Sequence, residues 1–159
     1  MSSGSEERTA LIESLSLAMR KVIVETVLLF DTLAERIGVN ATDMQCLNIL
    51  DYEGPVPAGR LAELTGLTTG AITAAIDRLE RAGYVQRVRD PHDRRRVVIQ
   101  PTPQEGQEVF GAIDQTWKDL CSRFSDQELT VILSFMNTLY QMNRGTVAHV
   151  RKDDARSST

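Results

Sequence analysis

Apolar residues recur at helical spacing along most of the chain, which predicts a largely α-helical fold. The first such stretch runs from about residue 8 to residue 37, and Gly38 then suits the end of a helix. From Val22 to Phe30 the apolar side chains cover nearly the whole circumference. A helix that is apolar all round is expected to be buried. Because the chain is short, we expect a second subunit to supply that cover.

Shorter helices follow, and each has its own start signal. Asn40 is placed to cap a helix that ends near Glu53. Two more helices come in quick succession over residues 58–65 and 68–83, with Thr68 as the cap of the second. The segment "GLT" between them is tight and contains glycine. Two short helices joined by so short a turn predict a helix-turn-helix.

Strand-like residues come directly after the second of these helices. The segments "YVQRVRD" and "RRRVVIQP" are rich in valine, and "DPHD" between them holds the residues that turns prefer. This pattern predicts a β-hairpin with arginines at and beside its tip. A hairpin that follows a helix-turn-helix is the wing of a winged helix, so we expect a mostly α fold with one small β-hairpin wing.

Two further helices are predicted on the C-terminal side, over residues 103–124 and 126–147. The quartets "TPQE" and "SDQE" precede them, and each has the form of a capping box, in which the first and fourth residues cap each other. The apolar spacing then divides the chain into three kinds of segment. They are a helical dimerisation region (8–37 and 103–147), a winged helix-turn-helix (40–100) and flexible tails (1–7 and 148–159).

Charge is distributed unevenly along the chain. The whole chain has a formal net charge of -4, yet residues 60–100 hold eight basic and five acidic residues. Five arginines lie between Arg87 and Arg96. A basic middle between acidic flanks indicates a surface for a polyanion. A solvated charged loop is the alternative, but exposed ion pairs contribute only about 0–1 kcal/mol, so stability gives little reason for five arginines here.

The order of these elements resembles the MarR-type transcriptional regulators over about residues 11–140. The matching pieces are "LAELTGLTTGAITAAIDRLERAGYVQR" and "RDPHDRRRVVIQPTPQEGQEV". The resemblance implies a homodimer whose N- and C-terminal helices interlock. It also implies that the second helix of each helix-turn-helix enters a major groove of double-stranded DNA, at a palindromic operator, while the wing enters the adjacent minor groove. Small anionic or phenolic ligands, or cysteine oxidation, typically release such regulators from DNA.

Residues at the start of the second helix and in the wing are the candidates for DNA contact. A helix N-terminus offers unpaired N–H groups to phosphate, and the narrow minor groove of A·T-rich DNA attracts arginine. Arg95 aligns with the wing-tip arginine of the family, and we expect Asp93 to orient its guanidinium. The predicted DNA-binding residues are Thr68, Thr69, Gly70, Thr73, Ala74, Arg78, Arg87, Arg89, Asp93, Arg94, Arg95 and Arg96.

The exposed face of the predicted recognition helix reads "TTGAITAA" and lacks the Arg, Asn and Gln side chains that read bases bidentately. Arg78 is its first basic residue, and its place further along the helix suits a backbone phosphate. We therefore expect modest direct readout, with specificity that depends on the wing, on thymine methyl groups and on DNA shape.

A ligand site is implied by the resemblance alone, in the crevice between the dimer helices and the winged helix. Its candidates are Met19, Ile23, Met44, Leu47, Trp117 and Met136, for each of which ordinary core packing is the alternative. Peroxide-sensing relatives carry a reactive cysteine in the first helix, where this chain has none. Cys46 lies among apolar residues of the second helix, so we expect a buried, inert thiol.

Other function classes find little support in the sequence. We find no catalytic motif and no paired spacing of His92 or His149 with another metal ligand, so we expect neither an enzyme nor a metal or other cofactor. The longest apolar stretch contains Glu25 and is far shorter than the ~20 residues that a membrane span needs. We expect a cytoplasmic protein. The main alternative to a DNA-binding regulator is a winged helix that serves as a protein-interaction module.

Overall fold

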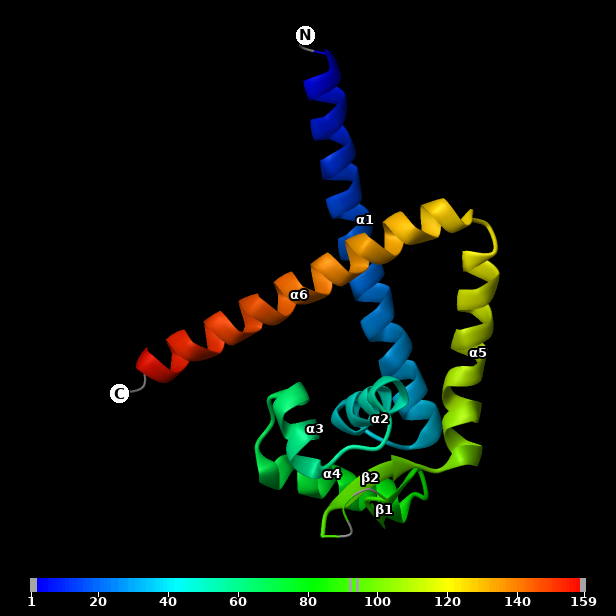
Figure 1. The fold of residues 1–159 in the computed structure, drawn as a ribbon, viewed down its shortest axis with the longest axis vertical. Helices are drawn as coiled ribbons and strands as arrows, with labels where there is room; N and C mark the ends of the chain where they lie inside the picture. The colour runs from blue at the N-terminus through cyan, green and yellow to red at the C-terminus, as the bar shows by residue number, and fades with distance from the viewer. Residues whose placement is uncertain (1–2, 92, 94, 158–159) are drawn as a thin grey trace. The chain divides into compact units, whose positions relative to one another are not determined.

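The computed structural model describes residues 3–91, 93 and 95–157 (Figure 1), without the side chains of residues 3, 103–109, 112 and 151–157. Its elements are α1 (Ser3–Ile37), α2 (Ala41–Glu53), α3 (Ala58–Thr65), α4 (Thr69–Arg81), β1 (Val85–Arg89), β2 (Val97–Pro101), α5 (Pro103–Cys121) and α6 (Asp126–Ser157). The chain forms two compact units, residues 1–111 and 112–159. The mostly helical fold with a small hairpin is as predicted.

The helices of the first unit begin and end at the signals that the sequence carries. The Asn40 side chain accepts a hydrogen bond of 2.9 Å from the backbone N–H of Asp43. Thr68 does the same for Ala71 at 3.2 Å, so both predicted caps are present. Gly66 ends α3 with a φ of 71°, a conformation that favours glycine. These caps bring α3 and α4 together as a helix-turn-helix.

The wing is a two-stranded antiparallel hairpin. Val85 pairs with Pro101 at one end of the ladder and Arg89 with Val97 at the other. Val56, in the loop between α2 and α3, exchanges two backbone hydrogen bonds with Ile99. This isolated bridge was not predicted, because the prolines and glycine around Val56 signal a break. It attaches the base of the wing to the helix-turn-helix.

The turn between α4 and β1 joins three elements of the first unit. The Tyr84 hydroxyl donates to the carbonyl of Ile37, the last residue of α1, at 3.3 Å. The Thr102 hydroxyl, just before α5, donates to the carbonyl of Gly83 at 2.8 Å. The position of α4 is thereby connected to the end of α1 and to the start of α5.

Both terminal helices are longer than the sequence suggested. α1 begins at Ser3 and α6 continues to Ser157, through most of the residues that we predicted to be tails. The polar residues at both ends contain no proline, and the Thr9 hydroxyl donates to the Ser5 carbonyl within the first turns. The polarity of these residues did not predict where the helices end. Once a helix is nucleated, polar residues can extend it in solvent without an apolar face.

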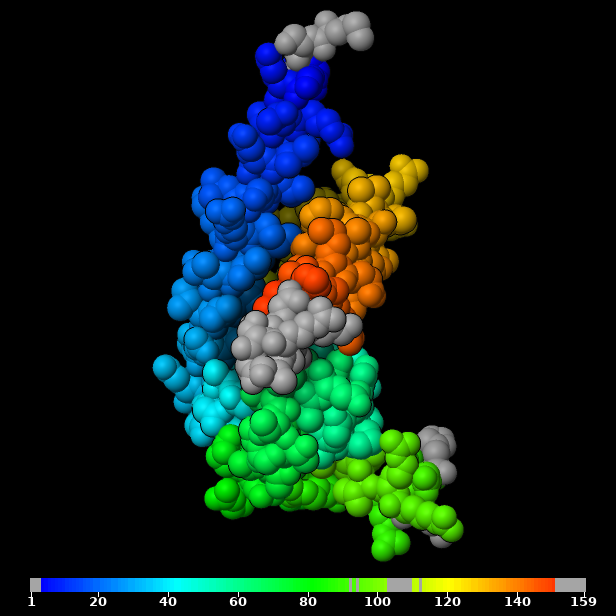
Figure 2. Space-filling view, turned by 90° about the vertical axis from the view of Figure 1, so that its left-hand side faces the viewer, coloured from blue at the N-terminus to red at the C-terminus, as the bar shows by residue number. Residues whose placement is uncertain are grey.

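The long apolar stretch of α1 is exposed in the single chain, where we expected a second subunit to cover it. The large apolar side chains between Val22 and Leu29 are 44–60% exposed. Figure 2 shows this helix, in blue, as a column of exposed side chains. In the second unit, α6 likewise exposes Val131, Leu133 and Met142. No helix in the described part of the chain has the length and hydropathy to cross a membrane.

Candidate nucleic-acid interface

The helix α4 has one buried and one exposed face, as its sequence predicts. Ile72, Ala75, Ile76 and Leu79 are at most 1% exposed and anchor it in the core. The predicted contact residues on the other side are exposed: Thr69, Gly70, Thr73 and Ala74, with the cap Thr68 before them. This outer face carries no charge and little bulk, so a surface of similar shape could approach its backbone closely.

The hydroxyl groups on this face are partly occupied. Thr73 donates its proton to the carbonyl of Thr69 at 2.9 Å, so toward a ligand it offers acceptor lone pairs and a methyl group. The oxygen of Thr68 accepts the capping bond, and its own proton can still be donated outward. Thr68 therefore suits a phosphate oxygen, and Thr73 suits an apolar group such as the methyl of thymine.

The guanidinium of Arg78, which we expect to contact a backbone phosphate, is paired with a carboxylate of the chain. Its Nε and Nη2 donate to the two carboxylate oxygens of Asp43 on α2, at 3.0 and 2.6 Å. The hydrogen bond to Asp43 raises the pKa of Arg78 above its usual value. Asp43 is 1% exposed. The sequence suggested for Asp43 only a favourable place in the first turn of a helix, and it gave no sign of this partner.

Arg87 on β1 is exposed but is also bound by carboxylates. Its guanidinium forms an ion pair with Asp77 at 2.5 Å and a second one with Glu80, both on α4. The backbone N–H of Arg87 donates to Glu80 as well, at 3.1 Å. The bond to Asp77 is the first cause of a pKa of Arg87 above the usual value. These bonds brace the wing against the recognition helix.

The tip of the wing has a different character. Arg89, Arg95 and Arg96 are exposed, and none of them takes part in the ion pairs formed between described residues. Figure 2 shows the hairpin projecting from the helices of its unit. Arg94 lies outside the described residues, as does His92. The result is a cationic projection that no ion pair within the described part of the chain neutralises.

Asp93 binds the backbone of the wing turn. Its side-chain oxygen accepts a hydrogen bond of 3.0 Å from the backbone N–H of Arg95, and its carbonyl accepts one of 2.9 Å from the N–H of Arg96. We expected the carboxylate to orient the Arg95 guanidinium. The structure gives it the role of a turn residue, which Asp performs by binding the backbone two residues on.

The comparisons with known proteins agree with this architecture. A model of the MarR family matches residues 37–96, from the end of α1 to the wing tip. The uncharacterised HTH-type transcriptional regulator YcgE of Bacillus subtilis (strain 168) is 42% identical over 120 residues, which cover 74% of this chain and 78% of YcgE. The chain belongs to the MarR family.

Solved structures of the family share the fold. A MarR family protein from Bacillus stearothermophilus superposes with a TM-score of 0.60 at 26% identity, over 87% of this chain and 97% of that one. A Staphylococcus aureus MepR mutant bound to an oligodeoxyribonucleotide has a TM-score of 0.51 at 20% identity, over 80% and 96%. This MarR-family chain is a DNA-binding transcriptional regulator with a winged helix.

The predicted ligand residues of this MarR-family chain lie in both compact units: Met19, Ile23, Met44 and Leu47 in the first, Trp117 and Met136 in the second. Met44 and Leu47 are core residues, with 1% and 5% exposure, and Met19 is half-buried. Ile23, Trp117 and Met136 are 53%, 54% and 45% exposed. For Met44 and Leu47 the alternative, ordinary core packing, describes what the structure shows.

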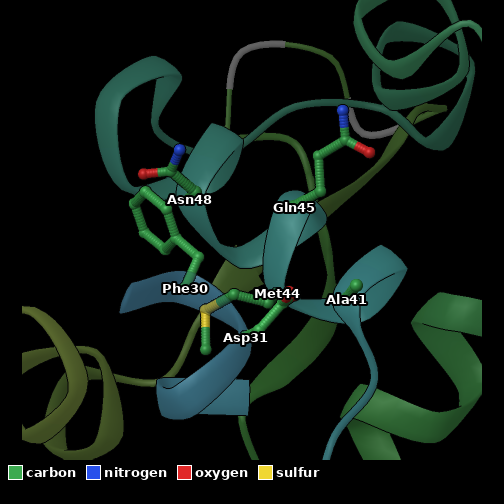
Figure 3. A pocket seen from close by; sticks show the side chains of 6 residues that line it. All are labelled: Phe30, Asp31, Ala41, Met44, Gln45 and Asn48. Atoms are coloured by element: carbon green, nitrogen blue, oxygen red, sulfur yellow. The ribbon is translucent and has the colours of Figure 1, made fainter. Parts of the chain in front are cut away.

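A small pocket does lie between α1 and α2, and Met44 lines it (Figure 3). Its volume is about 100 Å³. Phe30 and Asp31 of α1 and Gln45 and Asn48 of α2 are among its walls. An apolar cavity that holds benzene measures about 150 Å³, and the carboxylate of Asp31 opposes an anion. The pocket therefore does not suit the aromatic or anionic ligands that the resemblance implies.

Cys46 lies in the core beside the Asp43–Arg78 pair and is 0% exposed. Burial, and then the charge of Asp43, raise the pKa of its thiol to about 11, against a smaller opposing effect of Arg78. A thiol of that pKa is protonated at neutral pH and reacts slowly. The predicted burial of this cysteine is confirmed, and its inertness stays a prediction.

Proposed function

We propose that the protein is a homodimeric repressor that binds palindromic operators through α4 and the wing of each subunit. The observation that carries this proposal is the contrast within one surface. The guanidinium groups of Arg89, Arg95 and Arg96 on the wing form no ion pair within the described residues. Beside them, the exposed residues Thr69, Gly70, Thr73 and Ala74 at the start of the recognition helix are uncharged. Such a surface suits a DNA duplex, whose phosphates the wing would contact and whose groove the helix would approach closely.

The revised set of DNA contacts follows from the ion pairs. Thr68, Thr69, Gly70, Thr73 and Ala74 are proposed to meet the major groove. The wing arginines, with Arg95 foremost, are proposed to meet the minor groove and its phosphates. Arg78, Arg87 and Asp93 leave the contact set, because their side chains hold other parts of the winged helix.

The homodimer is supported by the apolar side chains that the chain leaves exposed. α1 alone exposes Leu11, Ile12, Leu15 and the large apolar residues from Val22 to Leu29. Contiguous apolar surface of this extent marks an interaction site. A two-fold axis presents two equivalent recognition surfaces, which predicts a palindrome with half-sites about one helical turn, ~10 bp, apart. Where such a palindrome overlaps a promoter, a bound dimer would block access of polymerase, and on this ground we propose a repressor.

The test combines selection of bound duplexes from a random pool with one pair of variants. Arg95→Ala is expected to weaken binding to the selected palindrome by about tenfold or more, because a minor-groove arginine is removed. Arg123→Ala removes an exposed arginine of the second unit and should change the affinity by less than about twofold. Equal effects of the two variants, or no binding to any duplex at low salt, would refute the proposal and favour the protein-interaction module.

Ligand release stays a prediction of the family resemblance, since the pocket between α1 and α2 does not suit an aromatic anion. Its measurement is simple. Trp117 is the chain's one tryptophan, so titration of the purified protein with salicylate as a probe and excitation of the indole would report binding near it. Quenching that parallels release of the DNA would support a ligand response.

A further inference from the structure

The Asp43–Arg78 pair connects the recognition helix to the core in a way that its other contacts do not. The two residues lie 35 positions apart, on α2 and α4. The Asp43 side chain is 2% exposed, whereas that of Arg78 is 40% exposed. A buried carboxylate on α2 is thus paired with a partly exposed arginine on α4.

The geometry of this pair restrains α4 more than the apolar contacts can. Ile72, Ala75, Ile76 and Leu79 pack by contact area, which has no direction and tolerates small rotations. The guanidinium is a planar fork, and two parallel hydrogen bonds fix both its plane and its position. Asp43 therefore determines how far α4 is turned about its axis, and with it where Thr69 and Thr73 point.

Stability alone does not account for the pair. A buried ion pair can often be replaced by apolar residues of similar size without loss of stability, because desolvation offsets the attraction. What apolar residues do not reproduce is the fixed geometry. The pair also neutralises the first cation of α4, which would otherwise attract any phosphate regardless of sequence.

We propose that Asp43 and Arg78 are positioning residues for sequence discrimination: they set the rotation of the recognition helix and do not contact DNA themselves. The proposal rests on the DNA binding proposed above. It predicts that breaking the pair lowers the ratio of specific to non-specific affinity while the protein still neutralises the same number of phosphates.

The main variant is Arg78→Lys, which keeps the charge but lacks the fork. We expect the ratio of affinities for the selected palindrome and for a scrambled duplex to fall about tenfold. A phosphate-contacting Arg78 would instead tolerate lysine. Arg81→Lys is the matched control, because Arg81 lies on the same helix, is exposed and donates from Nε only to the Asp77 carbonyl. It should keep the ratio.

Salt dependence separates the two roles a second time. A plot of log affinity against log salt concentration has a negative slope. Its magnitude decreases by about 0.9 for each phosphate that a variant no longer neutralises. For Arg78→Met we expect an unchanged slope together with a lowered specificity ratio. A slope reduced by about 0.9, with the ratio unchanged, would assign Arg78 to a phosphate and overturn the proposal.

Cys46 supplies the control for folding. Its buried thiol borders the pair, so in a Cys121→Ser background its rate of alkylation by iodoacetamide reports opening of the α2–α4 contact. The double variant Asp43→Leu/Arg78→Met replaces the pair by apolar side chains. We expect it to protect Cys46 as the wild type does, to bind scrambled DNA and to discriminate poorly.

The outcomes distinguish this proposal from the one on which it rests. Wild-type protein that binds no duplex at low salt refutes DNA binding itself. The positioning role alone is overturned if the wild type binds selectively and a variant discriminates equally well. That variant is either Arg78→Lys or the double variant, with Cys46 protected in it. If the double variant labels rapidly, the specificity ratio of Arg78→Lys and the salt slope of Arg78→Met still decide.

Discussion

The winged helix and the long terminal helices are made of the same kinds of residue but differ in what covers them. In the winged helix Leu61, Ile72 and Leu79 are 0% exposed. In α1 and α6 the side chains of Leu11, Val131 and Leu133 are 61–70% exposed. The winged helix finishes its core within one chain. The long helices present exposed apolar surface, and the proposed dimer rests on it.

The cause of the difference is visible in the patterning. α4 confines its apolar residues to one stripe, which a single layer of neighbours can cover. In the middle of α1 the apolar residues surround the helix, so that one neighbour never suffices. Bound caps such as Asn40 and Thr68 also fix the ends of the short helices. The contrast predicts opposite responses to substitution in the two regions.

The largest effect is expected for the double substitution Val24→Asp/Leu28→Asp in α1. These side chains are 57% and 53% exposed in the chain, so the fold of one subunit tolerates carboxylates there. An apolar dimer interface does not, because each buried charge is costly. We expect the dimer dissociation constant to rise on the order of 100-fold or more, as measured by sedimentation velocity over a range of concentrations.

The matched control is Ser5→Asp, which places a carboxylate in the first turns of the same helix, where it is compatible with the helix dipole. It should leave the association unchanged. Equal dissociation of both variants would mean that charge, and not the apolar surface, governs association. A wild type that sediments as a monomer at every concentration would remove the basis of the comparison.

A comparable effect, confined to the other region, is expected for Leu79→Ala. Leu79 is 0% exposed in the core of the winged helix. Truncation leaves a cavity and should lower the free energy of unfolding by about 3 kcal/mol. Leu79→Met keeps the volume and should cost less than about 1.5 kcal/mol. Urea denaturation measures both, and the loss should not depend on protein concentration in the way that the α1 variant does.

Much of this fold was predictable because its signals are local. The caps at Asn40 and Thr68, the glycine at the end of α3 and the turn residues of the wing each act on the nearest backbone groups. The same holds for the capping box before α6, in which Glu128 binds the N–H and the hydroxyl of Ser125. Such contacts can be recognised within a window of a few residues.

The partners of the arginines could not be predicted in this way. Asp43 and Arg78 are 35 residues apart, and nothing in either segment indicates the other. The signal for Arg87 was weak but present: Asp77 and Glu80 are spaced three apart on α4, and so project to one side, close to the strand that follows. An arginine count identifies a basic segment, whereas the fold decides which arginines remain available for DNA.

The smallest effect concerns pH and again belongs to the winged helix. The folded protein raises the pKa of Cys46 from 9.0 to about 11, chiefly by burial. A raised pKa contributes stability that is fully present below about pH 9 and is lost as the pH rises to about 11. In that interval the thiol ionises in the unfolded chain but stays protonated in the folded one. The wild type should lose roughly 2 to 3 kcal/mol there through this group alone.

Cys46→Ala removes that loss while the lysines and tyrosines continue to titrate, so the difference between the two proteins isolates the thiol. Urea denaturation of both at pH 8 and pH 11 would measure it, with Cys121→Ala as the control, since Cys121 is only partly buried. We expect the stability curve of Cys121→Ala to follow the wild type and that of Cys46→Ala to decline less steeply. Parallel curves for all three proteins would mean that Cys46 meets solvent, and that the winged helix closes its core less completely than its buried side chains indicate.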